Sequence, residues 1–274
     1  MSASMTSLIP AAIAAQRLVA EELRASGDEQ ILCRGSGDAI VCLPTFAELN
    51  FVYAPLADAL SRSWRVVLYA PRVSYVSPFG PAERATELMA VLDRLGVARA
   101  HLVAWSDAGA VVSEFSRRAP DRVLSRVYLG TPAAYVMPRG LRLMSAIYAR
   151  SGLYRFTPDR LAALLIALLM GSPAMPSRQL YRRIRALGPV AGYLRFSILP
   201  CLRYPNRAAG DCATLVVGGD ADRFVPLDEI RRLAEQPGAD FAYVRGADHF
   251  LPWTKASEVT ATVSAFLDRV RRPT

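Results

Sequence analysis

Three residue types that do much of protein chemistry are scarce in this chain. Among the 33 basic residues only Lys255 is a lysine, and the two histidines are His101 and His249. The four cysteines show no C-x-x-C spacing, which argues against a zinc site and against a disulfide framework. Any mechanism that needs a histidine base therefore has two candidates.

Long apolar runs are also missing. The longest, residues 161–170, is far shorter than the roughly 20 residues that a membrane span needs. The first residues lack a basic segment followed by a clean cleavage site, so we expect no secretory signal and a cytoplasmic protein. Residues 8–25 are predicted to be a helix that packs on the core, covers a site or makes a homodimer contact.

Short apolar segments alternate with helical patterns along most of the 274 residues. This alternation predicts right-handed βαβ units and a mostly parallel central sheet flanked by helices, an α/β fold. Residues 133–210 break the pattern and are predicted to be helical throughout. We therefore expect a core of residues 1–132 and 211–274 with an inserted all-helical cap, 133–210. The predicted strands are 31–34, 39–43, 64–69, 101–104, 123–129, 213–217 and 241–244.

Residues 101–115 are the segment around which the chain is organised. They predict a buried strand, a sharp turn and a helix, with Ser106 at the turn between Ala104 and Ala108. The central residue of such a turn has a strained backbone, and the flanking residues must be small to avoid a clash of their Cβ atoms. Gly109 extends this tolerance by one residue. The alternative is that Ser106 only caps the helix that follows.

Two later loops supply an acid and a base in the order that such a serine requires. Asp222 lies in the loop GDADRFVP, 219–226, and His249 lies in the loop GADHF, 246–250. With the turn AWSDAG, 104–109, these loops resemble the α/β-hydrolase fold from about residue 30 onward. The turn is similar to the G-W-S-D-G-G elbow of esterase-like members, and the loops are similar to the family's G-x-x-D-x-x-V-P and G-x-x-H loops. The resemblance implies Ser106 as nucleophile, Asp222 as acid and His249 as base.

The chemistry agrees with these roles. A serine hydroxyl is a weak nucleophile that needs a base within hydrogen-bond reach, and that base needs an orienting acid. Asp220 competes with Asp222 but lies two positions early for the family pattern. His101 lies at the start of its predicted strand and is interpreted as structural. Asp248 is expected to satisfy backbone donors of its own loop.

The resemblance also implies an oxyanion hole made of two backbone N–H groups. One comes from Asp107, whose side chain is expected to be an acid in the first turn of the helix. By position the other comes from Phe46, although the family's usual His-Gly is here Pro44-Thr45. The Thr45 hydroxyl is a candidate for substrate contact. Two tryptophans are further candidates, with simple packing as their alternative: Trp105 and Trp253.

Positive charge is concentrated in the predicted cap. Residues 139–207 contain twelve arginines and a single acid, Asp159, so this segment carries +11 while the whole chain carries +9. Such a surface attracts anions, and the candidates are an acyl carrier protein, a coenzyme A ester, a carboxylated metabolite and an anionic membrane surface. The alternative is solvated helix faces in an arginine-rich chain. No nucleic-acid-binding motif is present, so nucleic acid is not expected as a partner.

These observations predict a serine hydrolase of the esterase or thioesterase type, possessing a Ser-His-Asp triad. We expect it to cleave a carboxylic ester, lactone or thioester of a small-molecule acyl substrate through an acyl-enzyme, without a metal or an organic cofactor. The arginine-rich composition suggests a role in secondary metabolism. Three alternatives stay open: acyl transfer or cyclisation, lyase chemistry on the same triad, and a non-catalytic docking protein.

Overall fold

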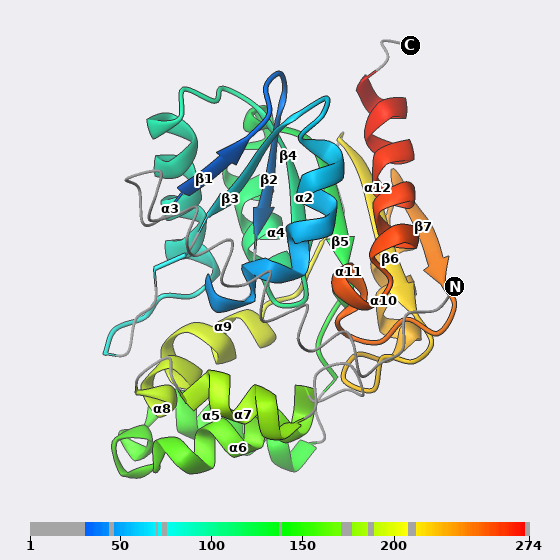
Figure 1. Cartoon of the computed structure of the whole chain (residues 1–274). Coiled ribbons are helices and arrows are strands. Elements are labelled where there is room, and N and C mark those ends of the chain that lie inside the picture. Colours follow the sequence, from blue (N-terminus) through cyan, green and yellow to red (C-terminus); the bar gives the residue numbers. More distant parts are fainter. Residues whose placement is uncertain are drawn as a thin grey trace.

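A computed structural model describes residues 31–43, 47–69, 71–72, 76–136, 139–170, 177–185, 189–207 and 212–271. Its centre is a sheet with the strand order β1-β3-β2-β4-β5-β6-β7 (Figure 1). β1 pairs with β3 antiparallel, and all the other neighbours are parallel. The strand bounds are β1 Ile31–Arg34, β2 Ala39–Leu43, β3 Arg65–Tyr69, β4 Ala100–Trp105, β5 Val123–Leu129, β6 Ala213–Gly219 and β7 Ala239–Val244.

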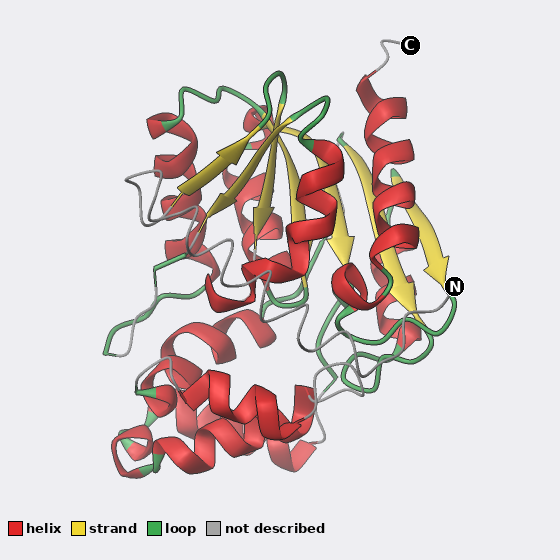
Figure 2. Ribbon diagram, viewed as in Figure 1, coloured by secondary structure: helices red, strands yellow, loops and turns green. Residues whose placement is uncertain are grey.

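Helices cover both faces of this sheet (Figure 2). Consecutive strand residues point to opposite faces, so Ile40 and Cys42 of β2 join one buried cluster while Val41 and Leu43 join the other. The first cluster contains side chains of α2 (Ala54–Leu60) and α12 (Ala256–Arg271). The second contains side chains of α3 (Pro81–Arg94), α4 (Ala108–Arg118) and α10 (Leu227–Ala234). Burial on both faces explains why these strands read as continuous apolar runs.

The helix boundaries follow local signals. Proline occupies the first position of α3, where its missing N–H costs no hydrogen bond, and the Glu83 side chain accepts a bond from the Gly80 N–H at 2.9 Å. Gly96, just beyond the end of α3, has a φ of +64° that favours glycine. Shorter helical elements complete the core: η1 Ala47–Tyr53, η2 Pro120–Arg122 and α11 Leu251–Thr254.

Between β5 and β6, the described part of residues 133–210 forms helices and no strand. We call this segment the helical insertion. It lies beyond the carboxyl ends of the parallel strands (Figure 1). Its last three elements follow one another without a break, and η4 is a π-type turn of the kind often found at functional sites. The elements are α5 Arg139–Arg150, η3 Leu153–Phe156, α6 Asp159–Met170, α7 Ser177–Arg185, α8 Val190–Tyr193, η4 Leu194–Ile198 and α9 Leu199–Leu202.

The predicted N-terminal helix, 8–25, lies outside the described residues. Within the described ranges, every helix is too short or too polar to cross a bilayer.

Candidate active site

Ser106 occupies the sharp turn between β4 and α4. Its φ of +57° is the only positive φ of a non-glycine residue in the described part of the chain, so the predicted backbone strain is confirmed. The Ser106 N–H donates to the carbonyl of Leu129, the last residue of the neighbouring strand β5, at 2.9 Å. The turn is thereby fixed at the carboxyl edge of the sheet, where ligands of parallel α/β sheets bind.

The need for a small residue after the turn is most acute at Gly109. A Cβ atom there would lie 2.3 Å from Cγ2 and 2.9 Å from Oγ1 of Thr131. Thr131 is fully buried, and its hydroxyl donates to the Ser106 carbonyl at 2.8 Å. Gly109 therefore leaves room for the side chain that holds the backbone of the serine.

The structure brings Ser106, His249 and Asp222 together in one chain of hydrogen bonds. His249 Nε2 lies 2.8 Å from Ser106 Oγ, and His249 Nδ1 lies 2.8 Å from Asp222 Oδ2. The side chains of His249 and Asp222 are 2% and 1% exposed, so water competes little for these bonds. This arrangement has the geometry that activates a serine hydroxyl.

The loop after β6 separates the two candidate acids. Asp222 Oδ1 accepts bonds from the backbone N–H groups of Phe224 and Val225, at 2.9 and 2.8 Å, which aims Oδ2 at His249. Asp220 is exposed, and its carboxylate accepts from the Gly246 N–H at 2.6 Å. That bond lowers the pKa of Asp220 and gives the carboxylate a structural partner away from the histidine.

The remaining histidine and acid have structural contacts. His101 is buried, lies 2.7 Å from the Ser125 hydroxyl through Nδ1, and stacks edge-on against Trp64. Burial lowers the pKa of His101 to about 4. Asp248 accepts bonds from its own loop through Oδ1, from the Phe250 N–H and from a nearby threonine hydroxyl.

Asp107 differs from the expectation of a first-turn acid. It occupies the N-cap position of α4 without a side-chain capping bond. Its carboxylate instead lies 3.6 Å from the guanidinium of Arg84 on α3, and both side chains are 3% exposed. A buried charge needs a partner of opposite sign, so Arg84 compensates the acid that follows the serine. Sequence reasoning missed this pair because the two residues are 23 positions apart.

Tyr135 is a further polar group at the serine that the sequence analysis did not identify. It lies in the loop after β5, and its hydroxyl is 3.1 Å from Ser106 Oγ. Burial, with the nearby charge of Asp107, raises the pKa of Tyr135 well above its usual value. The phenol therefore stays protonated and can donate to Ser106 Oγ. No motif marks this tyrosine, because its place depends on the path of an irregular loop.

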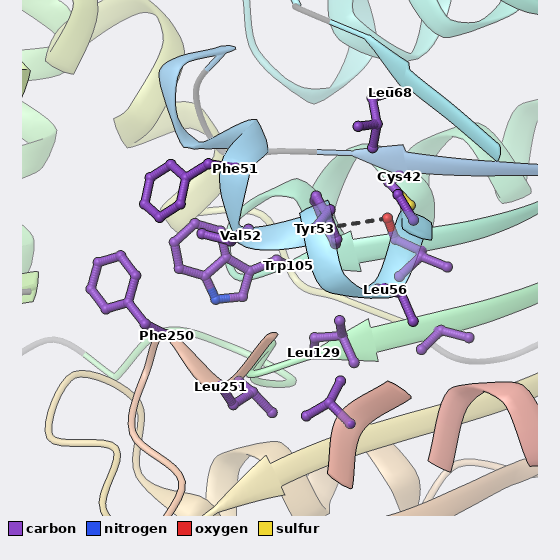
Figure 3. Close-up of a cluster of buried hydrophobic side chains, with 14 of the residues drawn as sticks. Cys42, Phe51, Val52, Tyr53, Leu56, Leu68, Trp105, Leu129, Phe250 and Leu251 are labelled. Carbon is purple, nitrogen blue, oxygen red and sulfur yellow. Dashed lines mark hydrogen bonds between the residues drawn. The ribbon is translucent and has the colours of Figure 1, made fainter. Parts of the chain in front are cut away.

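The two tryptophans proposed for substrate contact are both packed against other aromatic rings. Trp105 is fully buried and packs against Phe250 (Figure 3). Its indole N–H donates to the His249 carbonyl at 2.7 Å. Its side chain belongs to the buried cluster on one face of the sheet, and its ring centroid lies 5.6 Å from that of His249. Trp253 packs edge-on against Phe51, and neither tryptophan is among the described residues that line the apolar pocket next to Ser106. The contacts of both tryptophans therefore fit simple packing, the alternative to substrate contact.

An apolar pocket reaches Ser106 from the helical insertion. Its volume is about 520 Å³. Its walls are mainly aliphatic side chains of α5, α6, η4 and α9, together with Phe224 of the core. Of the described residues that line it, Asp107 is the only charged one. The pocket therefore favours an apolar group next to the serine.

Two predicted positions, Phe46 and Thr45, lie outside the described residues. Within the described ranges, no three His, Cys, Asp or Glu side chains gather as a metal site would require. All four cysteines are free thiols. Burial raises the pKa of Cys42 and of Cys201 to about 12, so neither thiol is a ready nucleophile or metal ligand at neutral pH.

Comparisons with known proteins show the family to which the chain belongs. The chain is 28% identical to polyketide synthase ThaQ of Burkholderia thailandensis over 92% of its own length, but it spans 13% of that synthase. It is also 28% identical to 2-hydroxy-6-oxononadienedioate/2-hydroxy-6-oxononatrienedioate hydrolase of Burkholderia vietnamiensis, over 68% of each chain. Among solved structures, a thermophilic esterase from Thermogutta terrifontis superposes with a TM-score of 0.70 at 19% identity, covering 88% of this chain and 93% of that one. Because the family model for the alpha/beta hydrolase family matches residues 33–263, this chain belongs to that family.

Proposed function

We propose that this protein is a serine hydrolase that cleaves a carboxylic ester, lactone or thioester through an acyl-enzyme. Ser106 is the nucleophile, His249 the base and Asp222 the acid that orients it. The observation that carries this proposal is the hydrogen-bond chain from Asp222 through His249 to Ser106, which ends at the apolar pocket. Residues 133–210 are proposed as a cap on a core of residues 1–132 and 211–274.

The reaction follows from the positions of these groups. Ser106 Oγ attacks the substrate carbonyl while His249 Nε2 takes its proton, and the imidazolium is stabilised by Asp222. His249 then returns the proton to the leaving group as the tetrahedral intermediate collapses to the acyl-enzyme. Water, deprotonated by the same imidazole, releases the acid.

During this attack, Ser106 Oγ becomes partly negative as its proton leaves, and negative charge then develops on the carbonyl oxygen of the substrate. We assign the oxyanion hole to the backbone N–H groups of Asp107 and Phe46. The Tyr135 hydroxyl adds a donor at Ser106 Oγ itself, 3.1 Å away, where it holds the oxygen in place and stabilises charge as the proton leaves. Arg84 balances the nearby carboxylate of Asp107, which would otherwise oppose this charge.

The acyl group is proposed to be apolar. The Burkholderia vietnamiensis relative is named for a dicarboxylate substrate, and a carboxylate next to the serine would need a cationic partner. No basic side chain is among the described residues that line the pocket. An aliphatic or polyketide-like chain matches those walls better, and the similarity to a segment of a polyketide synthase supports an acyl thioester in particular.

Acyl transfer or cyclisation is the second candidate. It uses the same Ser106 acyl-enzyme and differs only in the nucleophile that receives the acyl group. The similarity to a segment of a polyketide synthase favours this alternative, since a long acyl chain can carry its own hydroxyl nucleophile. Products from a hydroxyacyl thioester separate the two reactions: hydrolysis gives the free acid and cyclisation gives the lactone.

Labelling with a fluorophosphonate, read by intact mass, tests the proposed nucleophile. We expect one adduct on the wild type and none on Ser106→Ala. The matched control is Ser145→Ala, because Ser145 lines the same pocket. An unlabelled wild type, or an adduct that persists in Ser106→Ala, would contradict the mechanism.

A series of p-nitrophenyl esters and N-acetylcysteamine thioesters tests the acyl group. Each buried methylene contributes about 0.8 kcal/mol, so kcat/KM is expected to rise by about fourfold per methylene until the pocket is full. A flat profile, or a preference for acyl groups that carry a carboxylate, would contradict an apolar acyl site.

A further inference from the structure

Exposed apolar side chains are concentrated on the helical insertion. Twelve large hydrophobic residues are exposed in the described part of the chain, and ten of them lie between residues 136 and 168. Phe156 of η3 is 82% exposed, Met144 of α5 is 68% exposed and Leu168 of α6 is 61% exposed. We call the nine that belong to helical elements the apolar face: Leu143, Met144, Ile147, Leu153, Phe156, Leu161, Leu164, Leu165 and Leu168.

Helix α6 shows that a whole helix side is exposed rather than isolated residues. Leu161, Leu164, Leu165 and Leu168 follow helical spacing and are 44–61% exposed. The opposite side of the helix, which includes Ile166, is buried in the core cluster. Helix α6 is thus apolar on both sides. Contiguous apolar surface of this kind marks an interaction site.

Arginines accompany the apolar face on the same three elements. Arg139, Arg142 and Arg150 are exposed on α5, Arg155 on η3 and Arg160 on α6. The only acid in residues 139–207 is Asp159. One oxygen of its carboxylate accepts a bond from the Ala191 N–H at 2.9 Å. The surface therefore combines exposed leucines with a strong excess of positive charge.

The apolar face is continuous with the pocket. Met144, Leu165 and Leu168 are exposed to solvent and also line the cavity that reaches Ser106. The cavity thus opens among the exposed leucines. A molecule held at this face therefore lies next to side chains that line the pocket.

We propose that the apolar face docks on an anionic lipid surface. The leucines and Phe156 enter the acyl boundary of the lipid layer, and the arginines pair with lipid phosphates. A lipid layer supplies both the apolar phase and the negative charge that this face requires. An acidic protein supplies the charge, but it must also bring a matched apolar patch. Docking does not depend on catalysis, whereas delivery of a lipid-dissolved substrate to Ser106 rests on the proposed function.

Vesicle co-sedimentation of the full chain tests this docking. We expect binding to vesicles of equimolar phosphatidylcholine and phosphatidylglycerol, weaker binding at high salt, and little binding to phosphatidylcholine alone. The variant Phe156→Ser/Leu161→Ser/Leu164→Ser removes apolar residues that do not line the described pocket. The variant Arg142→Glu/Arg160→Glu reverses two charges. Each variant is expected to weaken binding by more than about tenfold.

Control variants make changes of the same kind on other parts of the chain. Val76→Ser removes an exposed apolar residue elsewhere, and Arg62→Glu/Arg245→Glu reverses two exposed charges on the core. Both should bind vesicles as the wild type does. Fluorophosphonate labelling of all variants in solution should stay at the wild-type rate, which shows that they are folded and separates loss of docking from failure of the proposed chemistry.

Three outcomes would overturn the proposal. The first is a wild type that does not bind anionic vesicles. The second is binding that survives in both face variants. The third is a wild type that does not bind vesicles but forms a dimer in sedimentation velocity, while the Phe156→Ser/Leu161→Ser/Leu164→Ser variant is a monomer. That result would make the apolar face an interface between two copies of the chain.

Discussion

The contact between Gly109 and Thr131 gives a quantitative prediction for the turn that carries Ser106. In Gly109→Ala the new methyl group would lie 2.3 Å from Thr131 Cγ2, so one of the two must move. Overpacking of a buried site costs about 1–3 kcal/mol, and loss of the hydrogen bond from Thr131 to the Ser106 carbonyl costs about 1–3 kcal/mol more. The helix propensity of alanine returns at most about 1 kcal/mol.

The expected net loss is about 3 kcal/mol in the free energy of unfolding, or roughly 6–12 °C in Tm for a chain of this size. We also expect a lower rate of fluorophosphonate labelling, because Thr131 no longer holds the backbone of the serine. Differential scanning calorimetry and labelling kinetics measure the two effects. Gly140→Ala on α5 is the matched control, since a Cβ there meets no atom within 4 Å, and it should leave Tm unchanged or raise it slightly.

A double-mutant cycle identifies the cause. Thr131→Ser removes the Cγ2 atom at 2.3 Å and keeps the hydroxyl that bonds to the Ser106 carbonyl. Gly109→Ala should therefore cost about 1–2 kcal/mol less in the Thr131→Ser background than in the wild type. An unchanged Tm in Gly109→Ala, or an equal loss in both backgrounds, would refute the steric reasoning.

Three further predictions concern single side chains. Tyr135→Phe should lower kcat by about 10- to 100-fold with little change in KM, because the tyrosine hydroxyl donates a hydrogen bond to Ser106 Oγ during attack. An unchanged kcat in steady-state kinetics would assign Tyr135 to packing alone. Asp222→Asn should lower kcat by about 10³–10⁴-fold, whereas Asp220→Asn, the matched control in the same loop, should have little effect; comparable losses in both would undermine the assignment of the acid. Burial lowers the pKa of His101 to about 4 from a usual value of about 6.5, so on acidification the unfolded chain binds a proton before the folded chain does. The free energy of unfolding should therefore fall by roughly 3 kcal/mol as the pH drops from 6.5 to 4. Thermal melts of His101→Gln should show a shallower decline over this pH range, and identical slopes in both proteins would contradict the prediction.

Much of the fold was predictable because its signals are local. Continuous apolar segments predict strands of a parallel sheet that is buried on both faces. Proline and glycine mark the start and the end of helices, as Pro81 and Gly96 do for α3. The helical character of residues 133–210 was also predicted, and the described part of this segment forms helices. The sequence could not indicate that the apolar side of Leu161, Leu164 and Leu168 faces solvent, because the same pattern describes a buried helix.

The candidate site divides in a similar way. The turn around Ser106 could be predicted from its neighbours, since small residues are required on both sides. For Trp105 the sequence left substrate contact and simple packing open, and the structure buries its side chain in the core cluster. Tyr135 and Arg84 were missed because nothing near them in the sequence marks their partners.

The sequence by itself determined the order of strands and helices, the strained turn and the set of residues available for catalysis. Each of these depends on neighbouring residues, through backbone strain, helix capping and apolar spacing. Only the tertiary structure decided that Asp222 rather than Asp220 meets His249, that Tyr135 meets Ser106, and that the pocket opens among exposed leucines. These contacts depend on how segments that are distant in sequence pack at the edge of the sheet. A shift of one residue in a loop there changes which side chain reaches the site.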